Sequence, residues 1–297
     1  MRLHHLNCIS TCPAGGRMMD GRSPFWAWRG RLCCHCVLAE LPQGGLALID
    51  TGLGLRDVHD PRSRLSAFFL ALVKPEWREA MTAVRQVEAL GFRADDVRHI
   101  VLTHLDFDHA GGLDDFPRAT IHLLRAERDV ALARRSWMDR QRFRPQQWSS
   151  RQRWRMYPDT QGEDWYGFKR ARPLEGLPPD IALVPLPGHT MGHAGVALRG
   201  GPTDWLLQAG DAYFHSREMD LDSPGCPPGL RFYQWMLEHD RGARLGNQQR
   251  LRELLRRHGG EVAVCSGHDV EEFEQLALHA ADTPATRAED GVRDVPV

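Results

Sequence analysis

Two kinds of segment follow one another along this chain: short apolar runs, and longer stretches in which apolar residues recur at helical spacing. Two apolar runs at 31–41 and 44–52 are joined by Pro-Gln-Gly-Gly, which predicts a β-hairpin. Apolar residues recur at helical spacing over 63–73 and 76–91. The run at 97–104 is typical of a short buried strand, and the next apolar run predicts a strand that leads into a helix at 119–127.

The second half of the chain shows the same alternation. It predicts strands at 180–188, 194–200, 204–211 and 261–268, and helices at about 247–258 and 269–280. No repeat at a solenoid period is present, so we expect a single domain over 1–297 with a flexible tail from about 282. Strands and helices in layers indicate an α/β sandwich.

The segment 130–175 differs in composition, because tryptophans are interleaved there with arginines. Stacking aromatics and positive charge could bind nucleic acid. The alternative is a helical, aromatic-rich cap insertion that packs on the body of the domain. The formal net charge of the whole chain is −1, so no nucleic-acid partner is expected and the cap is favoured.

Composition places the chain among ordinary globular proteins, with 42% hydrophobic and 26% charged residues. No apolar run approaches the roughly 20 residues of a membrane span, and the start lacks a signal core, so a cytoplasmic location is expected. Seven cysteines at irregular spacing predict reduced thiols. The run Cys33 to Cys36 suggests a zinc cluster, but alternate residues of an extended segment face opposite ways, which favours buried packing.

Residues that can ligate metal recur where the predicted strands end. These positions are Asp50, His104, His189, Asp211 and His268. In layered α/β folds, ligands gather at strand ends, where the loops converge. We therefore expect these side chains to meet in one site.

The stretch THLDFDHAGG, residues 103–112, is the densest part of this pattern. His104 and Asp106 project to one side of an extended chain, and a turn is needed to bring Asp108 and His109 to a neighbouring position. Such a cluster could serve two adjacent metals, completed by the later histidines, and Asp211 could bridge them through its two oxygens. Imidazole and carboxylate ligands suit zinc, iron or manganese.

The motifs HLDFDHAGG, PGHTMGH, GDAYF and SGHD, in this order, resemble those of the metallo-β-lactamase superfamily over about residues 32–280. The usual signature of that family is His-x-His-x-Asp-His followed by a distant His, Asp and His. Within the family the chain is most similar to the N-acyl homoserine lactone lactonases, which act in quorum quenching, and to glyoxalase II-like thioesterases.

The resemblance implies an αββα sandwich with a dinuclear metal site between the sheets. One ion would take His104, Asp106 and His189, the other Asp108, His109 and His268, and Asp211 would bridge. Asp50 would support the ligands from behind, and His193 is expected to be structural. Asp106 departs from the family, which mostly has His there. Its harder oxygen would move the preference from zinc towards iron or manganese, unless Asp106 only caps the turn.

The predicted reaction is hydrolysis of a lactone or ester, with a metal-bridging hydroxide attacking the carbonyl. Asp108 is a candidate proton shuttle beside the bridging Asp211, and Tyr213 is a candidate oxyanion donor or a packing residue. The predicted substrate wall consists of Met18, Met19, Phe25, Trp26 and Met191. The alternative role of its loop residues is anchoring or a homodimer contact.

Other functions remain compatible with the same motifs. A glyoxalase II-like thioesterase would need cations for a glutathione carboxylate, such as arginines in 140–155 or Lys169. A phosphodiesterase could use the same two metals. A metal-containing protein that binds a ligand without catalysis is the non-enzyme alternative. The expected partner is a small-molecule ester or lactone, with neither membrane nor nucleic acid involved.

Overall fold

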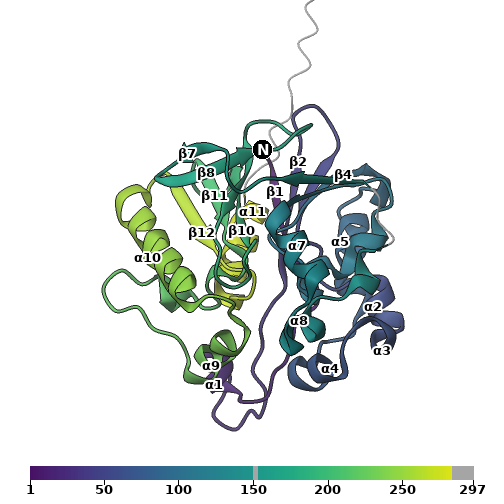
Figure 1. Ribbon diagram of the computed structural model, residues 1–297, viewed down its shortest axis with the longest axis vertical. Helices are drawn as coiled ribbons and strands as arrows, with labels where there is room; N and C mark the ends of the chain where they lie inside the picture. Colours follow the sequence, from purple (N-terminus) through teal and green to yellow (C-terminus); the bar gives the residue numbers. More distant parts are fainter. Residues whose placement is uncertain (150–152, 283–297) are drawn as a thin grey trace, which may run out of the picture.

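Two six-stranded sheets face each other in the computed structural model, which describes residues 1–149 and 153–282 (Figure 1). In spatial order the first sheet contains β1 (Leu3–Asn7), β2 (His35–Glu40), β3 (Leu46–Ile49), β4 (Val97–Val101), β5 (Thr120–Leu124) and β6 (Trp154–Tyr157). The second contains β12 (Val262–Cys265), β11 (Trp205–Gln208), β10 (Ala194–Arg199), β9 (Ile181–Pro185), β8 (Phe168–Pro173) and β7 (Glu163–Trp165). The predicted hairpin is confirmed as the antiparallel pair β2–β3.

Helices flank the two sheets and the loops at their ends. They are α1 (Arg17–Asp20), α2 (Leu55–His59), α3 (Pro61–Arg64), α4 (Ala67–Val73), α5 (Ala83–Ala89), α6 (Phe107–Ala110), α7 (Arg125–Ala133), α8 (Trp137–Arg142), α9 (Pro228–Leu237), α10 (Arg241–His258) and α11 (Val270–Asp282). Figure 1 shows α10 beside the second sheet and α5 on the opposite side, beside the first. The αββα sandwich is thereby confirmed.

The core forms because alternate strand residues point to opposite faces of each sheet. Between the sheets, Val37 and Ile49 of the first pack in one apolar cluster with Leu183 and Val196 of the second. The outer face of the first sheet packs against α5, and that of the second against α10. These layers fix the strand ends of both sheets relative to each other, and the loops at those ends carry the predicted ligands.

The segment 130–175 is only partly the cap that its composition predicts. It contains α8, but β6 extends the first sheet as a parallel neighbour of β5, and β7 and β8 form the edge of the second sheet. Trp154 packs against the apolar cluster outside the first sheet, and Phe168 lies in the apolar cluster outside the second. The aromatics of this segment therefore belong to the sheets and not to a separate cap. Residues 150–152 and the tail 283–297 lie outside the described residues.

None of the helices in the described ranges is both long and apolar enough to cross a membrane. All seven cysteines are free thiols, and Cys33, Cys34 and Cys36 are buried. The run Cys33 to Cys36 is therefore packed in the interior.

Candidate metal centre

The loop that follows β4 is held in place by Asp50, the residue directly after β3. Its carboxylate accepts hydrogen bonds from the backbone N of Thr103 at 2.8 Å and from the Thr103 hydroxyl at 2.7 Å. The same carboxylate lies 2.8 Å from Nδ1 of His109. Asp50 has a backbone φ of 55°, a left-handed conformation that Asp tolerates better than most residues. One carboxylate thus positions both ends of the His-rich loop.

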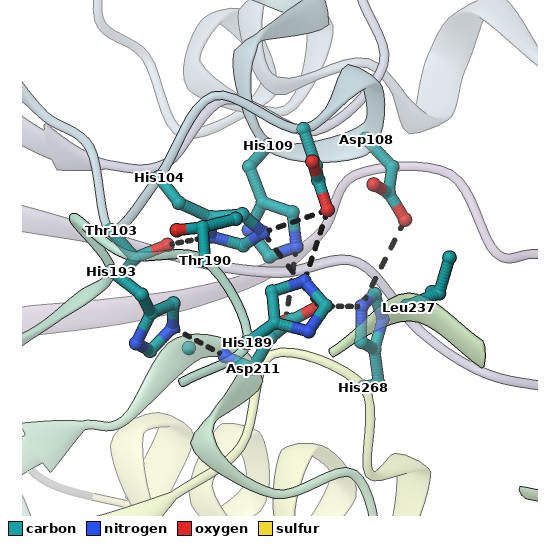
Figure 2. Close-up of polar contacts among 12 residues, drawn as sticks. Thr103, His104, Asp108, His109, His189, Thr190, His193, Asp211, Leu237 and His268 are labelled. Atoms are coloured by element: carbon teal, nitrogen blue, oxygen red, sulfur yellow. Dashed lines mark hydrogen bonds and ion pairs between the residues drawn. The ribbon is translucent and has the colours of Figure 1, made fainter. Parts of the chain in front are cut away.

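All seven residues predicted as ligands come together between the ends of the two sheets (Figure 2). Asp211 lies at the centre. Its Oδ1 is 3.2 Å from Nε2 of His109, and its Oδ2 is 3.2 Å from Nε2 of both His189 and His268. Asp108 lies beside His268, with its Oδ2 3.8 Å from that Nε2. Asp108 and His268 are about 160 positions apart in the chain, and they meet because the layered fold brings the strand ends together.

Three imidazoles are oriented by bonds to the nitrogen that points away from the cluster. Nδ1 of His109 faces Asp50, Nδ1 of His104 lies 2.9 Å from the Thr103 hydroxyl, and Nδ1 of His268 lies 2.8 Å from the carbonyl O of Cys33. In each ring Nε2 is left to face the cluster. This arrangement is the usual one for metal-ligating histidines, whose second nitrogen is held by a hydrogen bond.

Several buried polar atoms in the cluster have no hydrogen-bond partner among the described residues. They are Nε2 of His104, Nε2 of His109, Nδ1 of His189 and Oδ1 of Asp211. A buried polar atom without a partner is costly, and most such atoms in native proteins are satisfied. Imidazole and carboxylate ligand atoms within 4.8 Å of one another fit a divalent cation. His109, Asp211 and His268, with Asp108 beside them, are the residues that would hold it.

The charges of this cluster shift the pKa values of its members. Burial would raise the pKa of Asp211, but the imidazoles of His268 and His109 outweigh it and hold the pKa well below the usual range. Burial would lower the pKa of His109, but Asp211 and Asp50 together raise it well above its ordinary value. The carboxylates of the cluster therefore favour positive charge at the position where a cation would bind.

Asp106, the residue that departs from the family pattern, is paired with Arg142 at the end of α8. Nε of Arg142 donates to Oδ1 of Asp106 at 2.7 Å, and Nη2 donates to Oδ2. Burial would raise the pKa of Asp106, but the Arg142 guanidinium holds it well below its usual range. The side chain of Asp106 makes no capping hydrogen bond to α6, so it does not act as the turn cap considered above.

Arg142 could not be singled out from the sequence. An Asp in a position where His is expected does signal that a counter-charge is needed, because a buried carboxylate is costly alone. However, several arginines of the segment 130–175 could supply that charge, and only the tertiary structure selects Arg142. It is fully buried in the cluster.

Cys34 is a second residue whose position the sequence did not reveal. Its sulfur and the ligand atoms of Asp108 and His268 all lie within 4.8 Å of one another. Burial and the charge of Asp108 raise the pKa of this thiol well above its ordinary value. His193, by contrast, accepts a hydrogen bond from the backbone N of Asp211 at 2.9 Å and faces Leu186 O with its other nitrogen, which is a structural role.

Tyr213 lies in the apolar core of the second sheet and not beside the ligands. Its hydroxyl donates to the carboxylate of Glu272 at 2.8 Å. A hydroxyl that is committed to a buried carboxylate is not free for substrate, so the packing role, and not the oxyanion role, fits this position.

The residues predicted to form a substrate wall occupy different places. Met18 and Phe25 line one groove, Met191 lines other cavities, and Met19 is buried in an apolar cluster. Trp26 is 87% exposed. The loop 15–30 and Met191 therefore do not form a single wall, because they line different cavities of the folded protein.

Tyr233 of α9 is a residue that sequence reasoning missed. Its ring lies 6.0 Å from the ring of Phe214, which is itself 4.6 Å from that of His268. Burial, and then the carboxylates of Asp108 and Asp106, raise the pKa of Tyr233 well above its ordinary value.

Glu127 ties two ligand loops together from behind. It is buried and accepts hydrogen bonds from the backbone N of Leu105 at 2.9 Å and from the hydroxyl of Thr190. A Cβ on Gly192 would lie 2.0 Å from the backbone N of Glu127, so the two loops approach closely only because this residue is Gly. Burial raises the pKa of Glu127 to about 7.

This shift predicts how stability changes with pH. The folded pKa of about 7 exceeds the ordinary value of 4.5, so the folded state binds the proton more firmly. The contribution of Glu127 is therefore fully present at low pH and is lost as pH rises from about 4.5 to about 7, by about 3 kcal/mol. Urea unfolding at pH 5 and pH 8 should show that difference between the wild type and Glu127→Gln. An equal pH dependence in both proteins would contradict it.

Comparisons with known proteins agree with the fold and the cluster. Residues 29–268 match the family model of the metallo-beta-lactamase superfamily. A probable metallo-hydrolase of Mycobacterium tuberculosis is 40% identical over 282 residues, 95% of this chain and 84% of that protein. An N-acyl homoserine lactonase of Bacillus thuringiensis is 25% identical over 269 residues, 88% of this chain and 92% of that protein.

A solved N-acyl homoserine lactone hydrolase, with N-hexanoyl-L-homoserine bound at its catalytic metal centre, shares the fold. The match has a TM-score of 0.67 and 21% identity, and covers 92% of this chain and 95% of that one. The chain belongs to the metallo-β-lactamase superfamily. Within it, the chain is a metallo-hydrolase.

Proposed function

We propose that this protein hydrolyses a carboxylic ester of the lactone type. The observation that carries the proposal is the set of buried ligand atoms without partners, on His104, His109 and Asp211, at the strand ends. The similarity to an N-acyl homoserine lactonase over 92% of the length of that protein supports a lactone as the substrate class.

A bound divalent ion supplies Lewis acidity and an acidic water at neutral pH. His109, Asp211 and His268 would hold it, and Asp50 and the carbonyl of Cys33 fix the orientation of the two rings through their Nδ1 atoms. Asp108, 3.8 Å from His268, is placed to take a proton on a carboxylate oxygen and return it to the leaving alcohol. Its burial raises the pKa of Asp108, which favours its holding a proton.

We assign to Tyr233 the oxyanion-donor role that was predicted for Tyr213. The Tyr233 ring packs on Phe214, which in turn contacts His268, and from this position the phenol would donate to a carbonyl oxygen that becomes negative. Leu237, one turn further along α9, is on the same face of the helix and packs in one apolar cluster with Tyr233 and Phe214. The helix α9 would therefore form one wall of the reaction site.

Tyr233→Phe is expected to lower kcat for a lactone or ester by about 10- to 100-fold with little change in KM, because the lost donor acts on the transition state. Steady-state kinetics on purified protein measures this. Tyr213→Phe is the matched control. It removes a hydroxyl bound to Glu272 and should leave kcat unchanged. A larger loss of kcat in Tyr213→Phe than in Tyr233→Phe would contradict the assignment.

A glyoxalase II-like thioesterase is the second candidate, and one cavity favours it. A cavity of about 550 Å³ is lined by Lys169, Arg170 and Arg250 next to Met191. Lys169 is paired with Asp164, whereas burial, and then the charge of Arg170, lower the pKa of Arg250. Such a cavity suits a carboxylate on a substrate.

A substrate panel separates these functions. Acyl homoserine lactones, aryl esters, glutathione thioesters, β-lactams and phosphodiesters should be tested with the metal-loaded protein. Hydrolysis of lactones at the highest kcat/KM supports the proposal. A preference for the glutathione thioester supports the second candidate, and turnover of phosphodiesters alone would exclude both.

A further inference from the structure

The N–H groups of the Arg142 guanidinium donate to acceptors on Asp106, His189 and Leu237. Two groups bind the carboxylate of Asp106, and Nη2 also donates to Nε2 of His189 at 2.5 Å. Nη1 donates to the carbonyl O of Leu237 at 2.6 Å and lies 3.5 Å from that of His189. An Arg has no lone pair to offer, so His189 must be the acceptor in its contact. The guanidinium is enclosed by partners on every side.

The backbone holds this guanidinium in place. Phe143, the next residue, forms an antiparallel bridge with Asp106 and is fully buried. At the other end of α8, the Ser136 hydroxyl caps the helix, and Asp139 lies 2.7 Å from Nε2 of His239. The position of Arg142 is therefore fixed by the backbone around it. Arg142 reaches the cluster from a short helix that is anchored at both ends.

The same contacts remove ligands from one half of the predicted dinuclear site. Oδ2 of Asp106 and Nε2 of His189 are 3.0 Å apart, and Nη2 of Arg142 binds both. A metal ion shared by these two atoms would need the His189 lone pair, at about 2.0–2.2 Å, in the space that Nη2 occupies. Without them, only His104 and Asp211 remain on this side, fewer than the three protein ligands of a typical catalytic zinc.

The other half of the cluster is free of such competition. His109, Asp211 and His268 contact one another, and neither a Lys nor an Arg side chain among the described residues is hydrogen-bonded to them. Carboxylates also flank this half of the cluster: Asp108 lies 3.8 Å from Nε2 of His268, and Asp50 lies 2.8 Å from Nδ1 of His109.

We infer that this protein binds one divalent metal ion tightly, at His109, Asp211 and His268, and that the Arg142 guanidinium replaces the second ion of the family's site. The inference rests on the proposed metal-dependent function and changes its stoichiometry. Asp106 is then the partner of a fixed cation and not a metal ligand, and His189 is oriented by Arg142. Arg142 acts as a positioning residue, since its donors are all used.

Metal counting tests this without any substrate. Protein loaded with excess Zn²⁺ or Co²⁺ and then gel-filtered should contain close to one ion per chain by mass spectrometry of the metal. His268→Ala should lose that ion, whereas His104→Ala should keep it. Two ions in the wild type would overturn the inference and leave the hydrolase proposal standing. No ion at all would overturn both.

A double variant tests the role of Arg142 itself. Asp106→His with Arg142→Leu restores the family's ligand and removes the competing cation, and should bind close to two ions, with a second step in a Co²⁺ absorption titration. The neutral pair leaves no unpaired buried charge, so the fold is retained, which circular dichroism checks. A double variant that still binds one ion would overturn the inference.

Arg64→Leu provides the matched control. Arg64 is also buried and paired with an aspartate, Asp57 at 2.9 Å, but has no contact with a ligand side chain. It should leave the metal content at one while changing stability. If Arg64→Leu also raised the content to two, a general loosening of the fold would explain the effect, and the specific role of Arg142 would be overturned.

Discussion

Asp211→Ala is expected to lower kcat/KM for ester or lactone hydrolysis on the order of 10³-fold or more, a loss of about 4 kcal/mol in transition-state stabilisation. Asp211 has the largest effect because both of its oxygens face the ligand imidazoles, with 3.2 Å separating it from His109 and from His268. Without this carboxylate the two histidines no longer enclose a site for a cation. Metal content measured on the same samples should fall in parallel with activity.

The control for this experiment lies at the other end of the same strand. Asp204 precedes β11 and is exposed, whereas Asp211 follows β11 and is buried. Asp204→Ala should retain both the metal and the activity. Full turnover in Asp211→Ala, or equal losses in the two variants, would exclude the central role assigned to Asp211.

Asp106→Ala should reduce the free energy of unfolding by about 3–5 kcal/mol, because it leaves the Arg142 guanidinium buried without its counter-charge. The pair is wholly inside the protein, and Arg142 has no route to water in its present position. Urea unfolding in the presence of a chelator measures this, since chelation removes any stabilisation by bound metal.

The double variant Asp106→Ala with Arg142→Leu should recover most of that stability. Removing both charges of a buried pair is often close to neutral, whereas removing one is costly. The difference between the single and double variants therefore gives the coupling of the pair. A double variant that is less stable than Asp106→Ala would show that packing, and not charge, dominates at this site.

Much of the fold follows from local patterns. The hairpin β2–β3 and the strand-to-helix step from β5 to α7 were predicted, because two-residue and helical periodicities are properties of neighbouring residues. The segment 130–175 was harder. Its short strands become edges of the two sheets only through partners that are far away in sequence, and composition carries no record of those partners.

The ligand cluster shows the same division. The sequence by itself determined which side chains could bind metal, since His104, Asp108 and His109 fall within one loop and the other ligands each end a strand. Convergence of strand ends in a layered fold then makes their meeting foreseeable. The sequence did not identify the tyrosine near the ligands. Tyr213 was chosen by its spacing from Asp211, whereas Tyr233 comes near the cluster through the packing of α9.

What only the tertiary structure decided is the state of Asp106. From the sequence, the substitution of Asp for His reads as a change of metal ligand. In the folded protein, a bridge between Asp106 and Phe143 brings in a guanidinium from 36 positions away, and that cation takes both oxygens of the carboxylate. A sequence shows which charges a site contains. Which of them neutralise each other depends on distances of a few ångströms, and those are set only when the two segments pack.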